Sequence, residues 1–187
     1  SVSWHQDGVT LWDHDDWDEG SHGFNFMGQL YGCTPANGVW VVPGSHKKGK
    51  IDIAKMVAEA GSERLPDAVP IICAPGDVAI TNRQALHGSF ANTSKDWRVT
   101  INMGFHRRAS VLGVEGGGGH AAPRVYDEAH IKERSRLIGL AIDARHQHFP
   151  DETPFDYVPM RESGESLAWQ PGDKASLKDY NLLDMSI

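Results

Sequence analysis

The sequence lacks a basic excess, long apolar runs and paired cysteine motifs. Its 187 residues carry 25 acidic and 18 basic side chains, a net charge of −7, which argues against nucleic acid as the main partner because phosphate binding needs clustered Lys and Arg. No run of about 18 apolar residues occurs, so the sequence predicts no membrane span. The two cysteines, Cys33 and Cys73, form no C-x-x-C pattern. We interpret them as buried, reduced residues of a cytoplasmic protein.

The bulk composition predicts one ordinary domain. Hydrophobic residues make up 40% of the chain, enough for a core that needs no disulfide or structural metal, and 187 residues suit a single domain over 1–187. Prolines, glycines and acidic residues from 150 to 187 predict an irregular C-terminal tail. The chain opens directly on what reads as a core strand, so we expect that it lacks an N-terminal segment of a longer gene product.

The order of elements predicts a mainly β fold. Short strands are expected over 1–12, 24–31, 39–42, 69–73, 78–81 and 98–105, and helices over 51–61 and 127–148. Asn37-Gly38, between two of these strands, is a strong hairpin signal. In the strand over 98–105, Arg98 and Thr100 lie on the face opposite Val99. Many short strands with turns between them favour an antiparallel sandwich or jelly roll over a βαβ fold.

The first candidate for chemistry is His5-Gln6-Asp7. On a strand, alternate side chains point to the same face, so His5 and Asp7 would aim an imidazole and a carboxylate at one point. Two histidines and one carboxylate form the facial triad that holds non-haem Fe(II) and leaves other coordination positions open. The pair therefore predicts a metal site, provided that the chain supplies a second histidine.

His87, in Ala85-Leu86-His87-Gly88-Ser89, is the candidate third ligand, because a jelly roll can bring an early and a late strand side by side. Arg98 follows after a turn long enough to fold the next strand back beside it. Its planar guanidinium suits a carboxylate bound near the metal. Ser89 can donate its hydroxyl to the same carboxylate.

These motifs together resemble the phytanoyl-CoA dioxygenase family. They are His5-x-Asp7, the segment 37–47 (NGVWVVPGSHK), His87-x-Ser89 and Arg98, and the resemblance covers roughly residues 4–110. The family consists of Fe(II)- and 2-oxoglutarate-dependent oxygenases built on a double-stranded β-helix. The resemblance implies that His5, Asp7 and His87 bind Fe(II), that Arg98 pairs with the distal carboxylate of 2-oxoglutarate and that Ser89 assists.

The resemblance also implies an activity. O2 and 2-oxoglutarate would be cosubstrates, and the substrate would be a small molecule or an acyl compound. Related halogenases lack the carboxylate ligand, so Asp7 favours hydroxylation. The sequence departs from the family on the strand before Asn37-Gly38, where a polar or aromatic residue often contacts the cosubstrate. Met27 occupies that position, and Gln29 on the same face is expected to substitute as a hydrogen-bond donor.

Other interpretations remain open. The same fold can serve as a non-catalytic module that binds a ligand or a partner chain. A cupin-type metal enzyme is disfavoured, because no His-x-His with a later Glu occurs. His5 and Asp7 can also form a plain surface pair, and the acidic stretch 13–19 is better read as a solvated loop than as a Ca²⁺ site. An N-terminal segment missing from the sheet would expose an apolar face, so we expect homo-oligomers.

Overall fold

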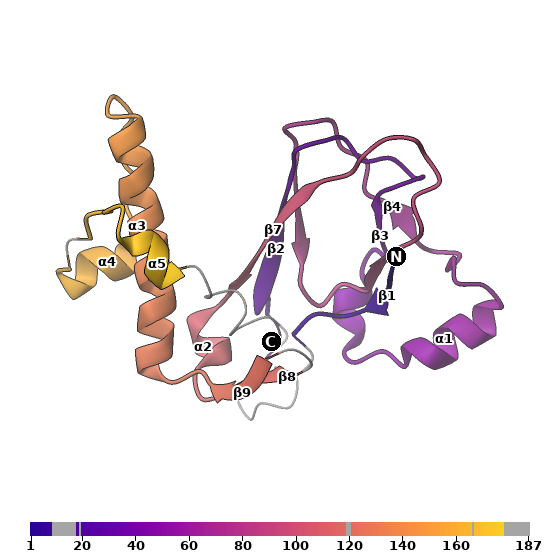
Figure 1. The fold of residues 1–187 in the computed structure, drawn as a ribbon. Coiled ribbons are helices and arrows are strands. Elements are labelled where there is room, and N and C mark those ends of the chain that lie inside the picture. Colours follow the sequence, from indigo (N-terminus) through magenta and orange to yellow (C-terminus); the bar gives the residue numbers. More distant parts are fainter. Residues whose placement is uncertain (9–17, 19, 119–120, 166, 178–187) are drawn as a thin grey trace. The chain divides into compact units, whose positions relative to one another are not determined.

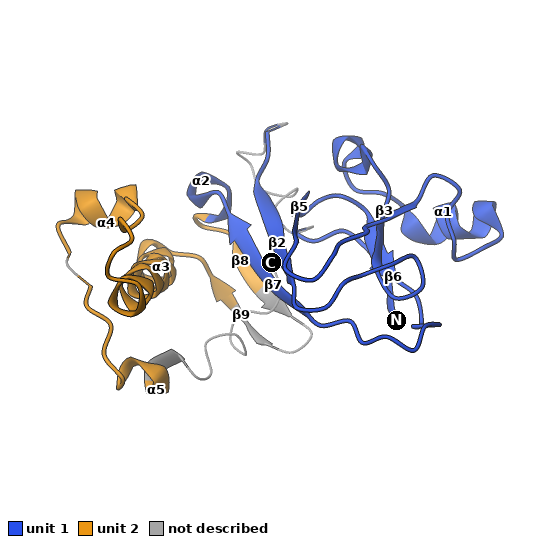
Figure 2. Ribbon diagram, turned by 90° about the horizontal axis from the view of Figure 1, so that it is seen from above, with its two compact units in different colours: residues 1–111, 187 blue, residues 112–186 orange. Residues whose placement is uncertain are grey.

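The computed structural model describes residues 1–8, 18, 20–118, 121–165 and 167–177 (Figure 1). By its contacts the chain divides into two compact units, residues 1–111 and residues 112–186 (Figure 2). The candidate metal ligands all belong to the first unit. The prediction of one domain over residues 1–187 stays a prediction.

Two antiparallel sheets form the frame of the first unit. The four-stranded sheet has the order β1 (Val2–His5), β6 (His87–Ser89), β3 (Val39–Val41) and β4 (Val69–Pro70). The three-stranded sheet has the order β5 (Val78–Asn82), β2 (Gly23–Gln29) and β7 (Thr100–His106). Successive strands in the chain alternate between sheets in several places, and the predicted mainly β, jelly-roll class is confirmed.

The described core of this unit lies beside the four-stranded sheet. Val42, Leu65 and Leu86 are buried together, and partly buried residues of α1 (Ile53–Ala60) pack against them. Asp52 caps this helix through the Lys55 N–H, and Gly61 ends it with a left-handed backbone. The helix predicted over 51–61 is therefore confirmed. Leu86 is fully buried, which anchors the backbone immediately before His87.

The two faces of the three-stranded sheet have an unusual distribution of polarity. On β2, the buried positions are Gly23, Asn25, Met27 and Gln29. On the opposite face, which we call the outer face, Phe24, Ile80, Ile101 and Met103 are exposed. The strand predicted over 98–105 begins only at Thr100, so Arg98 and Val99 lie in the segment before β7. Within β7 the predicted alternation is present, and Thr100 lies on the same face as the buried residues of β2. Polar groups on an inner face are costly to bury unless they form hydrogen bonds or bind a ligand.

The hairpin predicted at Asn37-Gly38 is wrong. The segment connects β2 to β3, and these strands belong to different sheets. Neither residue has a positive φ, which a type I′ hairpin turn requires at both central positions. The Thr34 carbonyl instead accepts the N–H groups of both residues, and a Cβ on Gly38 would lie only 2.7 Å from that carbonyl oxygen. Gly38 is therefore explained by close backbone approach.

The first strand is shorter than predicted. β1 ends at His5, and Asp7 lies in the turn that follows, where Gly8 has a φ of 69°. Residues 9–12 of the predicted strand, and most of the acidic stretch 13–19, lie outside the described residues. The described part of this unit also contains the short helices η2 (Ser45–Lys48) and α2 (Arg108–Val111).

The second unit begins with a strand pair and continues with helices. Strands β8 (Glu115–Gly118) and β9 (Ala121–Val125) pair antiparallel, and α3 (Glu128–His148) confirms the helix predicted over 127–148, with Asp127 as its N-cap. The segment expected to be irregular contains α4 (Val158–Ser163) and α5 (Asp173–Leu177). Pro159 is compatible with α4 because it lies in the first turn, whose N–H groups have no intrahelical acceptor. Within the described part of the chain, no helix combines the length and apolarity needed to cross a membrane.

Candidate metal centre

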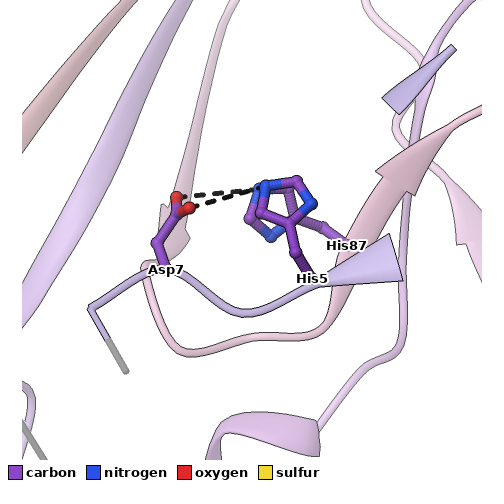
Figure 3. Close-up of side chains that lie close together, drawn as sticks. All are labelled: His5, Asp7 and His87. Carbon is purple, nitrogen blue, oxygen red and sulfur yellow. Dashed lines mark ion pairs between the residues drawn. The ribbon is translucent and has the colours of Figure 1, made fainter. Parts of the chain in front are cut away.

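His5, Asp7 and His87 converge on one point (Figure 3). His5 ends β1 and His87 begins β6, and the antiparallel register places them directly opposite each other. One ligand atom from each of the three side chains lies within 4.8 Å of the others. The Nε2 atom of His5 is 3.5 Å from Asp7 Oδ1, and Nε2 of His87 is 3.7 Å from Asp7 Oδ2. The structure thus brings together the three residues that the sequence singled out.

Backbone carbonyls orient both imidazole rings. Nδ1 of His5 lies 2.8 Å from the Ser3 carbonyl oxygen, and Nδ1 of His87 lies 2.9 Å from that of Ala85. A carbonyl oxygen only accepts, so Nδ1 carries the proton and donates in each ring. This leaves the Nε2 lone pair of each ring directed at the point beside Asp7. A metal-ligating histidine has the same arrangement, with one ring nitrogen free for the metal and the other hydrogen-bonded to the protein.

The environment of His87 favours its neutral form. Burial of the ring lowers the pKa of His87 and outweighs the Ala85 hydrogen bond and the Asp7 charge, both of which raise it. A neutral imidazole is the form that binds a metal. Two imidazoles and one carboxylate are a donor set that first-row divalent metals accept, so these three residues fit Fe(II).

Asp7 is held by two residues that lie outside the sequence motifs. Its backbone N–H donates to the Arg83 carbonyl at 3.0 Å, and its Oδ2 accepts from Nδ2 of Asn25 at 2.7 Å. The signal for Asn25 was present in the sequence, since it shares the inward parity of β2 with Met27 and Gln29. No pattern in the sequence indicated Arg83.

Arg98 and Ser89 line the same cavity. This cavity has a volume of about 410 Å³, and its wall also includes Asn37, Lys95 and Trp97. The described residues that line it do not include the three candidate ligands. Ser89 is two positions from His87 on β6 and accepts the Val2 N–H through its hydroxyl. Arg98 and Ser89, the two residues expected to bind a carboxylate, therefore line one cavity, and Ser89 lies on the strand that carries His87.

Gln29 is linked to Arg98 through one hydroxyl group. Arg98 donates from Nη1 to Thr100 Oγ1 at 3.4 Å, and Thr100 donates to Oε1 of Gln29 at 2.9 Å. The amide nitrogen of buried Gln29 donates to the Met27 carbonyl at 3.3 Å. Gln29 was predicted to donate a hydrogen bond to the cosubstrate. In the structure its Oε1 accepts a hydrogen bond from Thr100, the residue that also contacts Arg98.

The cysteines lie opposite each other. Cys33 and Cys73 form an isolated antiparallel bridge with backbone hydrogen bonds in both directions, and both are free thiols. Cys33 is buried as predicted, whereas Cys73 is half-buried.

The chain matches a protein-family model. The family model "Phytanoyl-CoA dioxygenase (PhyH)" matches residues 1–100. No curated protein gives a significant match to the chain.

Solved structures give partial matches. EvdMO1 is 30% identical, with 57% of this chain and 23% of that protein covered and a TM-score of 0.44. EctD from S. alaskensis, solved with 2-oxoglutarate and 5-hydroxyectoine, is 25% identical, with 59% and 40% covered and a TM-score of 0.46. HygX from Streptomyces hygroscopicus, solved with nickel and 2-oxoglutarate, is 19% identical, with 46% and 36% covered and a TM-score of 0.38. The chain thus spans less than half the length of these proteins.

Proposed function

The chain belongs to the phytanoyl-CoA dioxygenase (PhyH) family, and from this membership we propose that it acts as an Fe(II)- and 2-oxoglutarate-dependent dioxygenase that hydroxylates a small-molecule or acyl substrate. The observation that carries the proposal is the convergence of His5, Asp7 and His87 within 4.8 Å. If His5 and Asp7 formed only a surface ion pair, nothing would explain why His87, distant in the sequence, also turns its Nε2 toward the Asp7 carboxylate.

The proposal assigns Fe(II) to His5, Asp7 and His87. With 2-oxoglutarate and O2, the bound metal would supply the oxidising chemistry, which side chains alone do not provide. The protein's own contribution is to hold three ligands on one side and leave the other positions open. The carbonyls of Ser3 and Ala85 support this role because they fix the Nδ1–H tautomer of each ring.

The proposal assigns the 2-oxoglutarate carboxylate to Arg98. A guanidinium presents two parallel N–H donors that match a carboxylate. Two observations support the assignment: Arg98 lies two residues before Thr100, which pairs with the inward-facing Gln29, and it lines a cavity together with Ser89. Thr100 and Gln29 would hold the guanidinium in place through their hydrogen-bonded chain.

The product class follows from the ligand set. A retained carboxylate at Asp7 leaves no ligand position for a halide, which favours hydroxylation over halogenation. A cytoplasmic location, in which Cys33 and Cys73 would stay reduced, remains a prediction.

The test is iron-dependent turnover of 2-oxoglutarate. Succinate release is measured with Fe(II), ascorbate and a panel of small metabolites and acyl compounds, using the wild-type chain and Asp7→Ala. Release that requires both Fe(II) and Asp7 supports the proposal, and its dependence on one panel member names the substrate class. Tight binding of a panel member without any succinate release would instead favour a non-catalytic binding module.

A further inference from the structure

We propose that Arg83 and Asn25 are positioning residues for the metal site and that together they hold the carboxylate of Asp7 as a ligand. The inference rests on the proposed function, since it concerns the same centre. It identifies two residues that neither the motifs nor the family match single out. Three observations support it: the orientation of the Asn25 amide, the contacts of Arg83 with both the backbone and, through Asn25, the side chain of Asp7, and the absence of a side chain at Gly104, which leaves room for the guanidinium.

Asn25 connects the arginine to the ligand. It is buried on β2, its Oδ1 accepts from Nη1 of Arg83 at 2.9 Å, and its Nδ2 donates to Oδ2 of Asp7 at 2.7 Å. An arginine can only donate, so it requires the amide oxygen on its side. The amide N–H2 group is then turned to Asp7. Without the guanidinium, the amide could flip and set its oxygen against the carboxylate.

Arg83 holds Asp7 through its main chain as well. The Asp7 N–H donates to the Arg83 carbonyl at 3.0 Å, and the Arg83 N–H donates to the Gly23 carbonyl at 3.3 Å. The same residue therefore fixes the backbone of Asp7 and, through Asn25, its side chain. This double attachment matters because Asp7 lies in a turn after β1, where no strand pairing fixes its direction.

Gly104 provides the space for the guanidinium. It lies opposite Asn25 in the register of β2 and β7. A Cβ at Gly104 would overlap Nη1 of Arg83 and would lie 3.1 Å from its Cζ. Glycine weakens the interior of a strand and often marks close approach of another group. Gly104 has no positive φ, so the arginine side chain, and not backbone conformation, accounts for glycine here.

The chemical consequence concerns the two oxygens of Asp7. The amide of Asn25 donates to Oδ2, which favours Oδ1 as the oxygen for the metal. Hydrogen bonds to ligating groups typically contribute 10- to 100-fold to metal affinity or activity. Loss of the hydrogen-bonded chain from Arg83 through Asn25 to Asp7, which we call the relay, should therefore be measurable even though all three ligands remain.

The experiment measures Co²⁺ affinity by isothermal titration calorimetry in the full chain. Arg83→Ala, Asn25→Ala and Gly104→Ala should each weaken binding by about 10- to 100-fold. Gly28→Ala is the matched control, because a Cβ there would meet only ordinary contacts, the nearest at 3.6 Å, and it should bind Co²⁺ like the wild type. Arg83→Ala combined with Gly104→Ala should bind no more weakly than Arg83→Ala alone, because both changes remove one interaction.

A second readout separates positioning from general stability. The visible absorption spectrum of bound Co²⁺ reports its coordination, so it should change in Asn25→Ala and Gly104→Ala at saturating metal and stay unchanged in Gly28→Ala. Arg83→Lys should recover part of the affinity, and it serves as the test if Arg83→Ala fails to fold. Wild-type affinity and spectrum in Gly104→Ala and Asn25→Ala would overturn the relay and leave the metal site intact. Absence of Co²⁺ binding in the wild type would overturn the relay and the proposed function together.

Discussion

The rings of His5 and His87 lie 4.2 Å apart between centroids, at paired positions of two antiparallel strands. Cross-strand partners are the closest side chains that a sheet offers, so pairing of β1 with β6 is what makes two distant histidines neighbours. Asp7 then needs only one turn of backbone to reach both Nε2 atoms. The centre therefore depends on one strand pairing and one turn.

Asp7→Ala should weaken Fe(II) binding. The variant keeps both imidazoles but loses the anionic member of the three proposed ligands, so the dissociation constant should rise by at least the roughly 10- to 100-fold that loss of a supporting group typically causes. The measurement is anaerobic titration with Fe(II). Asp67→Ala, which removes an exposed carboxylate elsewhere, should leave the constant unchanged. Wild-type affinity in Asp7→Ala would contradict the ligand assignment.

Arg98→Ala should weaken 2-oxoglutarate binding and spare the metal. Losing one partner of a charge-assisted pair costs roughly 2–5 kcal/mol when the other charge stays buried, so the apparent constant for 2-oxoglutarate should rise more than about tenfold. Fe(II) titration should give the wild-type value. Lys95→Ala is the control: Lys95 lines the same cavity but is exposed, where charge interactions are weak. Equal effects in both variants would point to a nonspecific charge contribution.

The sequence predicts the inward-facing residues well, because strand parity is local. The alternation around Arg98 and along β2 determined which side chains share a face, and the register pairs Gln29 with Thr100 as those parities require. The caps Asp127 and Gly61 likewise fixed the ends of two helices. In each case the deciding interaction lies within a few residues in the chain.

The sequence does not predict what depends on sheet membership. Asn37-Gly38 reads as a hairpin because its dipeptide preference is local, yet the strands on either side join different sheets. The Arg83–Asn25–Asp7 relay joins three segments, and its traces in the sequence are the inward parity of Asn25 and a glycine, Gly104, inside a good strand. A glycine of this kind indicates close approach but does not name the group that approaches.

His130 should make stability fall in acid. Burial of this ring near the start of α3, where the helix dipole also disfavours a cation, lowers the pKa of His130 below 6.5. The surrounding charges act in both directions: Arg124 and Arg134 lower the pKa, and Asp127 and Glu133 raise it.

The sign follows from proton linkage. Below pH 6.5, the unfolded state protonates this histidine before the folded state does, so the free energy of unfolding decreases as pH falls through that range. Urea titrations across the range should show this decrease, and His130→Gln should reduce it. An identical pH dependence in the variant would show that other groups are responsible.

The outer face of the three-stranded sheet should cause self-association. Ile80, Phe26 and Met103 are aligned across β5, β2 and β7, and Ile80 and Met103 are 65% and 43% exposed. Contiguous exposed apolar patches tend to mark association sites, and a second copy of the chain is the partner always present in a purified sample. Light scattering at micromolar concentration should therefore give a mass above that of one chain, and Ile80→Lys should shift it toward the monomer because a charge opposes burial of the face.

Ile72→Lys is the matched control, since Ile72 is 66% exposed but lies outside these strands, and it should leave the mass unchanged. A clean wild-type monomer would show that this face does not bind a second copy.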